Sequence, residues 1–333
     1  MTRTIPYPLL ILALAASVVI AAALSMLIGP SGVGFSQLLR VISEGENDIA
    51  WTIISEIRLP RTILAVMVGA TLGLAGATLQ GFLRNPLADP GVVGVSATAA
   101  LGAVLALYTG ISAAFPLALP LMAIGGGLAC VILLQGLAGR GGMLTLILAG
   151  VAISSLAGAL TSLALNLSPN PYAALEIVFW LLGSVTDRSM DHVWLAAPFM
   201  FAGWLVMAWT APALNALTLG EDAAVSLGVD LTRTRAFVIA GTALGVGAAV
   251  AVSGAIGFVG LVTPHLLRPS VGHSPARLLP ASALGGALML TAADVLVRVI
   301  TPGSELRLGV ATALIGAPFF IWLVLRSRVE LES

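Results

Sequence analysis

The chain has 333 residues, of which 59% are hydrophobic and only 9% are charged, and its formal net charge at pH 7 is zero. Its mean hydropathy of +1.06 excludes an ordinary water-soluble globular domain. A helix needs about 20 apolar residues to cross a bilayer core of about 30 Å. We therefore expect an all-α, polytopic membrane protein in which residues 1–333 form a single transmembrane domain.

The basic and sulfur-containing residues exclude several kinds of chemistry. All fifteen basic residues are arginine, so the chain lacks the lysine that a phosphate-binding P-loop requires and cannot hydrolyse ATP by that route. Cys130 is the only cysteine, which excludes an internal disulfide and a thiolate metal cluster. We expect no metal site and no permanently bound cofactor, so energy for any active transport must come from outside this chain.

The first apolar run, residues 9–28, follows Arg3 and ends near small residues, which is also the pattern of a secretory signal peptide. The run is longer than a usual signal core, and we therefore expect a retained first helix. Further runs without charge cover residues 62–83, 90–139, 141–175, 193–220, 236–267, 278–293 and 308–325. Two of them are interrupted, near 110–116 and near 253–257, which gives about ten transmembrane helices in all.

The arginines favour one orientation in the membrane. With an even number of spans both termini lie on the same side, and the arginine-rich side is expected to be cytoplasmic. Placing both termini in the cytoplasm puts nine arginines inside and six outside. The outer six are Arg40, Arg58, Arg61, Arg188, Arg298 and Arg307. Glycines spaced along residues 69–76 and 254–260 predict that helices pack closely there.

Two segments between spans stand out. Residues 84–91 contain two prolines and a glycine, which predicts a tight non-helical turn that serves either as a rigid connector or as a gate. In the loop of residues 214–233, Thr218 and Glu221 have the spacing of a helix capping box, and Gly228 is a natural helix stop. This loop is predicted to present a short helix, either an ordinary surface helix or a docking helix for a cytosolic partner.

Ionisable residues within spans are few. Asp294 and Arg298 lie one helical turn apart and can simply pair with each other, although an ion-coupled secondary carrier would also use such groups. The three histidines are scattered and form no HExxH motif, so a metal-dependent enzyme or a membrane-embedded transferase is disfavoured. An ion-coupled secondary carrier therefore stays open as an alternative function.

Many motifs in order along nearly the whole chain resemble the FecCD-type permeases, which carry ferric siderophores, haem and cobalamin through the bacterial inner membrane. They are Arg58-Leu-Pro-Arg61, Gly76-Ala-Thr-Leu-Gln80, Arg84-Asn-Pro-Leu-Ala-Asp-Pro90, Leu148-Ala-Gly-Val151, Leu219-Gly-Glu-Asp-Ala-Ala-Val-Ser-Leu-Gly228, Gly257-Phe-Val-Gly-Leu-Val-Thr-Pro-His265, Leu278-Leu-Pro280, Ala293-Asp294 with Arg298, and Gly316-Ala-Pro318. The resemblance implies a type II ABC importer permease-like fold.

The resemblance also implies partners and roles. Two copies of the subunit would form the pathway, with two cytosolic ATP-binding subunits beneath and a periplasmic ligand-binding protein above. Binding-protein docking would fall to Arg58, Arg61 and Arg298, as outward-facing charges. Coupling to the ATPase would fall to Glu221, Asp222, Ala223, Ser226 and Gly228, and the inner gate to Asn85, Leu87, Gly142 and Met143. The pathway would be lined by Ser154, Ser155, Thr161 and Ser162, although these hydroxyls can also bond backbone carbonyls one turn back.

The resemblance leaves the ligand open among ferric siderophore, haem and cobalamin. At residues 305–309 the sequence has Arg307 where the family pattern usually has proline. This adds a positive charge that would meet a haem propionate or an acidic residue of the binding protein, or that has no role.

Overall fold

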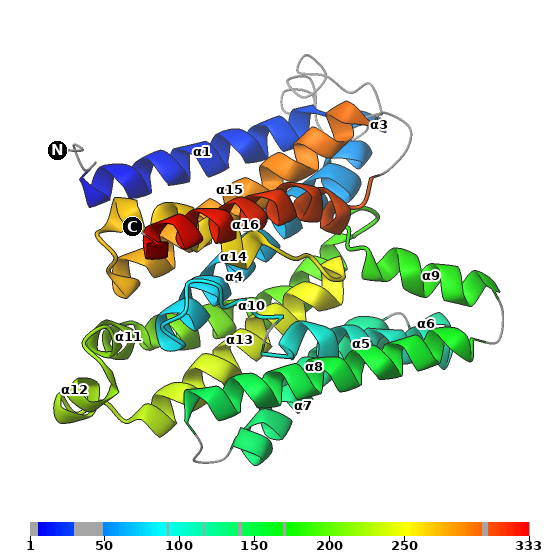
Figure 1. Cartoon of the computed structure of the whole chain (residues 1–333). Coiled ribbons are helices and arrows are strands. Elements are labelled where there is room, and N and C mark those ends of the chain that lie inside the picture. The colour runs from blue at the N-terminus through cyan, green and yellow to red at the C-terminus, as the bar shows by residue number, and fades with distance from the viewer. Residues whose placement is uncertain are drawn as a thin grey trace.

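The computed structural model describes residues 6–29, 49–91, 93–115, 117–138, 142–168, 171–301 and 306–332, and every regular element in these ranges is a helix (Figure 1). The expected all-α class is therefore confirmed. In chain order the elements are α1 (Tyr7–Leu27), α3 (Ile49–Thr52), η1 (Ile53–Arg58), α4 (Leu59–Phe82), α5 (Val95–Tyr108), α6 (Ile111–Ala114), α7 (Ala118–Ala138), α8 (Met143–Asn166), α9 (Pro171–Leu181), α10 (Met190–Trp209), α11 (Ala211–Leu217), α12 (Glu221–Ser226), α13 (Leu231–Ser253), α14 (Val259–Leu267), η2 (Pro269–Val271), α15 (Pro275–Ile300) and α16 (Leu308–Glu332).

Seven helical segments among the described residues are long and apolar enough to cross a membrane. They are α1, the continuous segment Ile49–Phe82 that ends with α4, α7, α8, α10, α13 and α15. Three shorter apolar helices accompany them, namely α5, α9 and the Leu308–Leu323 part of α16. Both predicted interruptions are present, since α5 and α7 are separate helices, as are α13 and α14. The sequence predicted about ten transmembrane helices; seven described segments are long enough to span a membrane, and of the three shorter ones, α5 and the Leu308–Leu323 part of α16 lie where further spans were expected.

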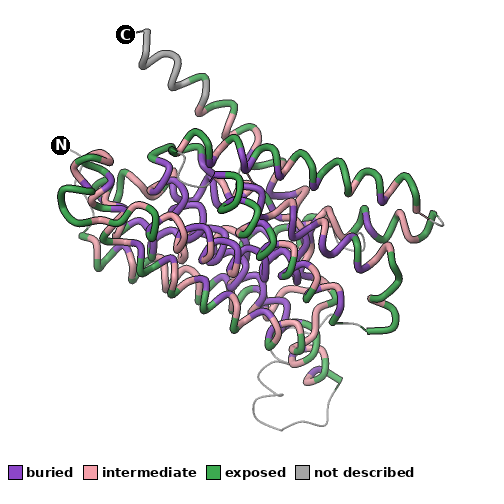
Figure 2. The backbone as a smooth tube through the Cα atoms, turned by 90° about the horizontal axis from the view of Figure 1, so that it is seen from below, coloured by how far each residue is buried: buried purple, intermediate pink, exposed green. Residues whose placement is uncertain are grey.

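Helices α4 and α13 form the centre of the bundle. Both are buried along most of their length, whereas the outer helices leave large parts of their surface uncovered (Figure 2). α4 packs against α10, α13, α14 and α15, and α13 packs against α7 and α10. Lipid tails are as apolar as these uncovered helix faces, so exposing the faces to a bilayer costs no free energy. The distribution of buried and uncovered surface therefore suits a protein embedded in lipid.

Glycines let α4 approach two neighbours backbone to backbone. A Cβ atom added at Gly73 would overlap the backbone of α15 at Ser282, and one added at Gly76 would overlap the carbonyl group of Gly260 in α14. The predicted close packing is therefore confirmed at these glycines. It is wrong for Gly257, where an added Cβ would meet nothing within 4 Å, because this residue lies in the loop before α14 rather than in a helix contact.

The bundle has two distinct ends. The beginning of α1, the end of α16, α11 and α12 lie at one end, on the left of Figure 1, which we call the α12 end. α3, α6 and α9 lie at the opposite end, which we call the α9 end. The chain crosses between these ends repeatedly, so residues far apart in sequence meet at each end.

Candidate transport pathway and coupling site

The predicted coupling loop contains a short helix, α12, that projects at the α12 end. Glu221 and Asp222 form its first turn, and Ser226 Oγ donates a hydrogen bond to the carbonyl oxygen of Asp222. After the helix, Gly228 has a φ of +87°, a backbone conformation that favours glycine. The predicted helix stop at Gly228 is therefore confirmed. Ala223 is half-buried and lies on the same helix.

The predicted capping box at the start of this helix is wrong. Gly220, not Thr218, occupies the capping position of α12, and no side chain caps the helix. Thr218 Oγ1 instead donates to the carbonyl oxygen of Asn215, because Thr218 ends the preceding helix α11. The separate helix α11, which the sequence pattern did not predict, takes up the first half of the loop.

The exposed surface of the coupling loop is apolar as well as acidic. Leu219, Val225 and Leu227 expose 69%, 54% and 65% of their surface. These residues surround a helix whose first turn carries two carboxylates. Large apolar side chains gathered at a loop tip outside the spans are typical of a surface that a partner covers.

The turn between α4 and α5 is ordered by its own side chains. Asn85 Oδ1 accepts a hydrogen bond from the backbone N–H of Leu87 at 2.9 Å, and Asp89 Oδ1 accepts one from the N–H of Gly91 at 2.9 Å. Such bonds form Asx-turns, which replace the helical pattern that the prolines interrupt. The predicted non-helical turn is confirmed, with Asn85 and the side chain of Leu87 exposed at its tip.

The turn and the coupling helix contact each other directly. Arg84, which has a φ of +45°, places Nη2 at 3.4 Å from Glu221 Oε1, the first residue of α12. Glu221 also lines a small crevice together with Met143 and Arg235. The structure thus brings the predicted gate residue Met143, the predicted gate turn and the predicted coupling helix to one place at the α12 end.

Gly142 precedes Met143 and forms the N-cap of α8, with extended backbone at ψ −176°. An added Cβ at Gly142 would meet nothing within 4 Å, so the position is spacious in this single chain. Only the family resemblance grouped Gly142 and Met143 with the turn; in the structure Met143 shares a crevice with Glu221, which in turn contacts Arg84.

The three arginines predicted to dock a binding protein turn inward. Arg58 and Arg61 expose only 4% and 9% of their surface, and the side chain of Arg298 exposes 6%. Arg58 Nη1 donates to the carbonyl oxygens of Met26 and Leu27 at the end of α1. The expectation that these side chains are exposed is therefore wrong, because the end of α1 and a buried carboxylate cover them, whereas their outer location and their role in docking stay predictions.

Asp294 is the centre of this buried cluster. It is fully buried and accepts hydrogen bonds from Arg61 Nε and Nη2, the latter at 2.9 Å, and from Arg298 Nη2. Arg298 Nη1 also donates to the carbonyl oxygens of Ser25 and Ile28. The pairing of Asp294 with Arg298 predicted from their spacing is confirmed, and the addition of Arg61 ties α4, α15 and α1 together at the α9 end.

The four predicted pathway hydroxyls on α8 differ in environment. Ser154 Oγ donates to the carbonyl oxygen of Gly91 at 3.0 Å, so this residue fastens α8 to the turn after α4. Ser162 Oγ bonds the carbonyl oxygen of Gly158 one turn back, as the alternative interpretation expected. Ser155 is exposed and Thr161 is half-buried.

One face of α8 is uncovered in this chain. Leu144, Leu148, Val151, Ser155 and Ser162 are exposed and recur at the spacing of a single helical stripe, while the opposite face packs on α5 and α7. The helix is therefore available on that face to line a pathway or to meet another subunit.

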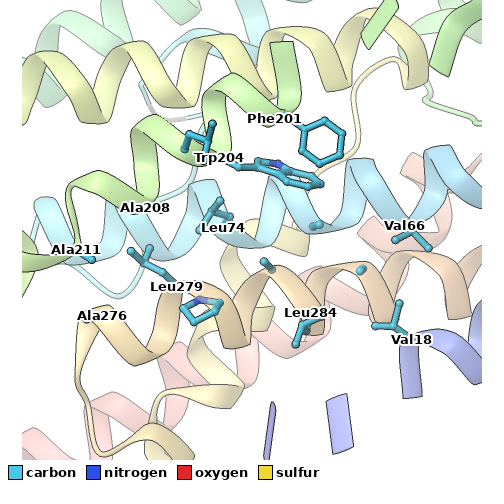
Figure 3. Close-up of a pocket in the computed structure, with 15 residues that line it drawn as sticks. Val18, Val66, Leu74, Phe201, Trp204, Ala208, Ala211, Ala276, Leu279 and Leu284 are labelled. Atoms are coloured by element: carbon cyan, nitrogen blue, oxygen red, sulfur yellow. The ribbon is translucent and has the colours of Figure 1, made fainter. Parts of the chain in front are cut away.

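A large cavity lies elsewhere, between α1, α4, α10 and α15. It measures about 690 Å³ and has almost entirely apolar walls, including Phe201, Trp204 and Leu284 (Figure 3). Trp204 Nε1 is satisfied within the protein by Thr71 Oγ1 at 2.8 Å. None of the predicted pathway residues lines this cavity, so it is an apolar groove between helices rather than the predicted pathway.

Comparison with known proteins gives relatives over most of the chain. It is 39% identical over 289 residues to a haemin transport system permease protein of Yersinia pestis, covering 85% of this chain and 86% of that protein. It is 42% identical over 286 residues to a vitamin B12 import permease of Vibrio cholerae, covering 85% and 84%. It is 42% identical over 277 residues to the Fe(3+) dicitrate permease of Escherichia coli, covering 83% and 86%.

The fold has a counterpart among solved structures. An inward-facing structure described as a putative metal-chelate type ABC transporter superposes with a TM-score of 0.84 and 34% sequence identity, covering 96% of this chain and 99% of that chain. Residues 17–326 match the FecCD transport family. With these relatives, this fold and the motifs in family order, the chain belongs to the FecCD transport family.

Proposed function

We propose that this chain is the membrane-spanning permease subunit of an ATP-driven importer that moves an iron chelate into the cytoplasm by alternating access. A ferric siderophore or haem is the proposed ligand class, with cobalamin as a further candidate. The names of the relatives, which include haemin, vitamin B12 and ferric dicitrate permeases, support this range. ATP hydrolysis would reside on a separate subunit, since the chain lacks a P-loop lysine.

The observation that carries the proposal is the contact between α12 and the turn after α4. A subunit driven by an external ATPase needs a surface that receives the motion and a mechanical link from that surface to a gate. The exposed apolar residues around α12 supply the surface, and the Arg84–Glu221 pair with the Met143 crevice supplies the link. A carrier driven by an ion gradient has no need of such a docking helix.

The proposed assembly contains two copies of this chain, two cytosolic ATP-binding subunits and one periplasmic ligand-binding protein. The uncovered stripe on α8 is suited to face a central pathway between the two copies. The α12 end would face the cytoplasm, so both termini would lie there in a multi-pass protein of the bacterial inner membrane. The beginning of α1 and the end of α16 lie at the same end as α12, which supports placing both termini on the side of the coupling helix.

Docking of the binding protein on Arg58, Arg61 and Arg298 remains a prediction, and their burial counts against direct contact in this conformation. Burial of Asp294 against two arginines also bears on the alternative of an ion-coupled carrier. A carboxylate that binds and releases protons or sodium must be accessible and uncompensated, whereas Asp294 is neither.

The proposal is tested by tagging this chain in a strain that expresses its genomic neighbours and purifying it in mild detergent. We expect an ATP-binding subunit to co-purify in equal amount. In proteoliposomes, uptake of a radiolabelled iron chelate delivered by its binding protein should require ATP. Uptake that persists without the ATP-binding subunit and stops when the ion gradient is collapsed would favour the carrier instead.

A further inference from the structure

A polar pocket lies at the α9 end and shares no lining residue with α8 or with the large apolar groove. Its volume is about 350 Å³, and its polar lining includes Glu176 of α9, Arg188 of the loop before α10, and His192 of α10. The ends of α5 and α13 and the beginning of α7 supply apolar walls. We call it the Arg188 pocket. None of the residues discussed so far for coupling, gating or transport lines it.

Arg188 is fixed in place by a backbone carbonyl group and forms no ion pair with another described residue. Its Nε donates to the carbonyl oxygen of Val252 at 2.6 Å, which holds the guanidinium group at the end of α13. Within the described ranges no carboxylate lies at ion-pair distance from it, although Asp187 is its neighbour in sequence. Burial lowers the pKa of Arg188, as expected for a desolvated cation. The charge of Asp187 offsets part of this desolvation, and an anion bound in the pocket would offset more of it.

His192 adds a second donor to the pocket. The backbone N–H of Ser189 donates to His192 Nδ1 at 3.2 Å, so Nδ1 is an acceptor and a neutral imidazole must carry its proton on Nε2. The ring is held in this tautomer at the first turn of α10, a helix of 20 residues. The positive end of the helix dipole therefore lies at the same pocket and favours negative charge.

From these observations we propose that the Arg188 pocket binds the carboxylate group of a small molecule, with Arg188 and His192 Nε2 as donors. A carboxylate matches the fork of a guanidinium group and accepts a further bond from the imidazole. Glu176 lines the same pocket, and its charge favours a ligand with a single carboxylate over a polyanion. In the orientation proposed above the pocket opens outside the cytoplasm, but the binding chemistry does not depend on that orientation or on transport.

The test uses the purified full chain in detergent, labelled with ¹⁵N-histidine. The chain has three histidines, and a His192→Gln variant assigns the His192 signal. Sodium acetate is titrated at constant ionic strength against sodium chloride. We expect a saturable shift of the His192 signal with acetate and none with chloride. In Arg188→Gln the acetate affinity should fall at least about tenfold, since a charge-assisted hydrogen bond is lost. Arg307→Gln, which removes a nearby arginine that does not line the pocket, should bind acetate within about twofold of the parent.

A second variant keeps the test decisive if Arg188→Gln fails to fold. Ala113 lines the pocket and is exposed, so Ala113→Trp should obstruct it without disturbing the core and should abolish the acetate shift. An equal response to chloride, a shift that does not saturate, or full acetate affinity in Arg188→Gln or Ala113→Trp would overturn the proposal. The acetate titration uses this chain alone, without an ATP-binding subunit. A negative titration would therefore overturn only the pocket proposal and leave the proposed transport function untouched.

Discussion

Replacing Asp294 with alanine would test whether the buried charge cluster holds the α9 end together. The substitution leaves Arg61 and Arg298 buried without the carboxylate to which both donate. Removing one partner of a buried ion pair destabilises proteins by about 3–5 kcal/mol. Arg298 keeps its bonds to the carbonyl oxygens of Ser25 and Ile28, so we expect the lower part of that range.

Reversible unfolding in mixed micelles of increasing SDS content would measure the change in free energy of unfolding. Asp294→Asn serves as the conservative variant, since it keeps the volume and one acceptor oxygen and should lose less stability. Arg84→Ala is the matched control, because the Arg84–Glu221 pair is nearly half exposed and should contribute at most about 1 kcal/mol. A loss below about 1 kcal/mol in Asp294→Ala would refute the assignment of the cluster as a stabilising element.

Three further substitutions have definite expected outcomes. Gly76→Leu should prevent stable expression, because the new side chain would collide with the backbone of α14. Gly158→Leu is the control and should express normally, because there is open space beside Gly158. Fluorescence-detected gel filtration measures both. Arg84→Glu should lower the amount of ligand transported per ATP hydrolysed, because it places a second carboxylate beside Glu221. Adding Glu221→Arg should restore this coupling, and a double variant without restored coupling would contradict the proposed link between α12 and the turn. Burial raises the pKa of Asp89 above 3.8, so the folded chain binds this proton more tightly and stability should fall as pH rises from about 4. Asp89→Asn should remove that fall, and parallel melting curves across pH would show the reasoning to be wrong.

The sequence predicted the helical framework well because that framework follows from local composition. Runs of apolar residues without charge give helices, and prolines or glycines within the runs mark the breaks before α7 and α14. The capping box at Thr218 failed for the opposite reason. The same residues also suit the end of a preceding helix, and only the formation of α11 decided between the two.

The candidate site was predicted in part. The turn at Asn85 and the helix that begins at Glu221 were identified from motifs, yet nothing in the sequence showed that they contact each other, since Arg84 and Glu221 are 137 positions apart. The Arg188 pocket was missed altogether. Arg188 lies on the side of the membrane where the charge pattern disfavours arginine, which was a signal, but its place in a pocket with His192 and Glu176 appears only after folding.

The sequence by itself determined that this is a helical membrane protein of the FecCD transport family that cannot hydrolyse ATP through a P-loop, because composition, charge and ordered motifs are properties of the chain alone. Tertiary structure alone decided that Arg58 and Arg61 are buried. The spacing of Asp294 and Arg298 already predicted that these two residues pair, but only packing brings Asp294 to Arg61 across 233 positions and makes all three side chains part of the interior. Helix packing sets the surroundings of a charged side chain, and those surroundings determine whether it serves a partner or the fold.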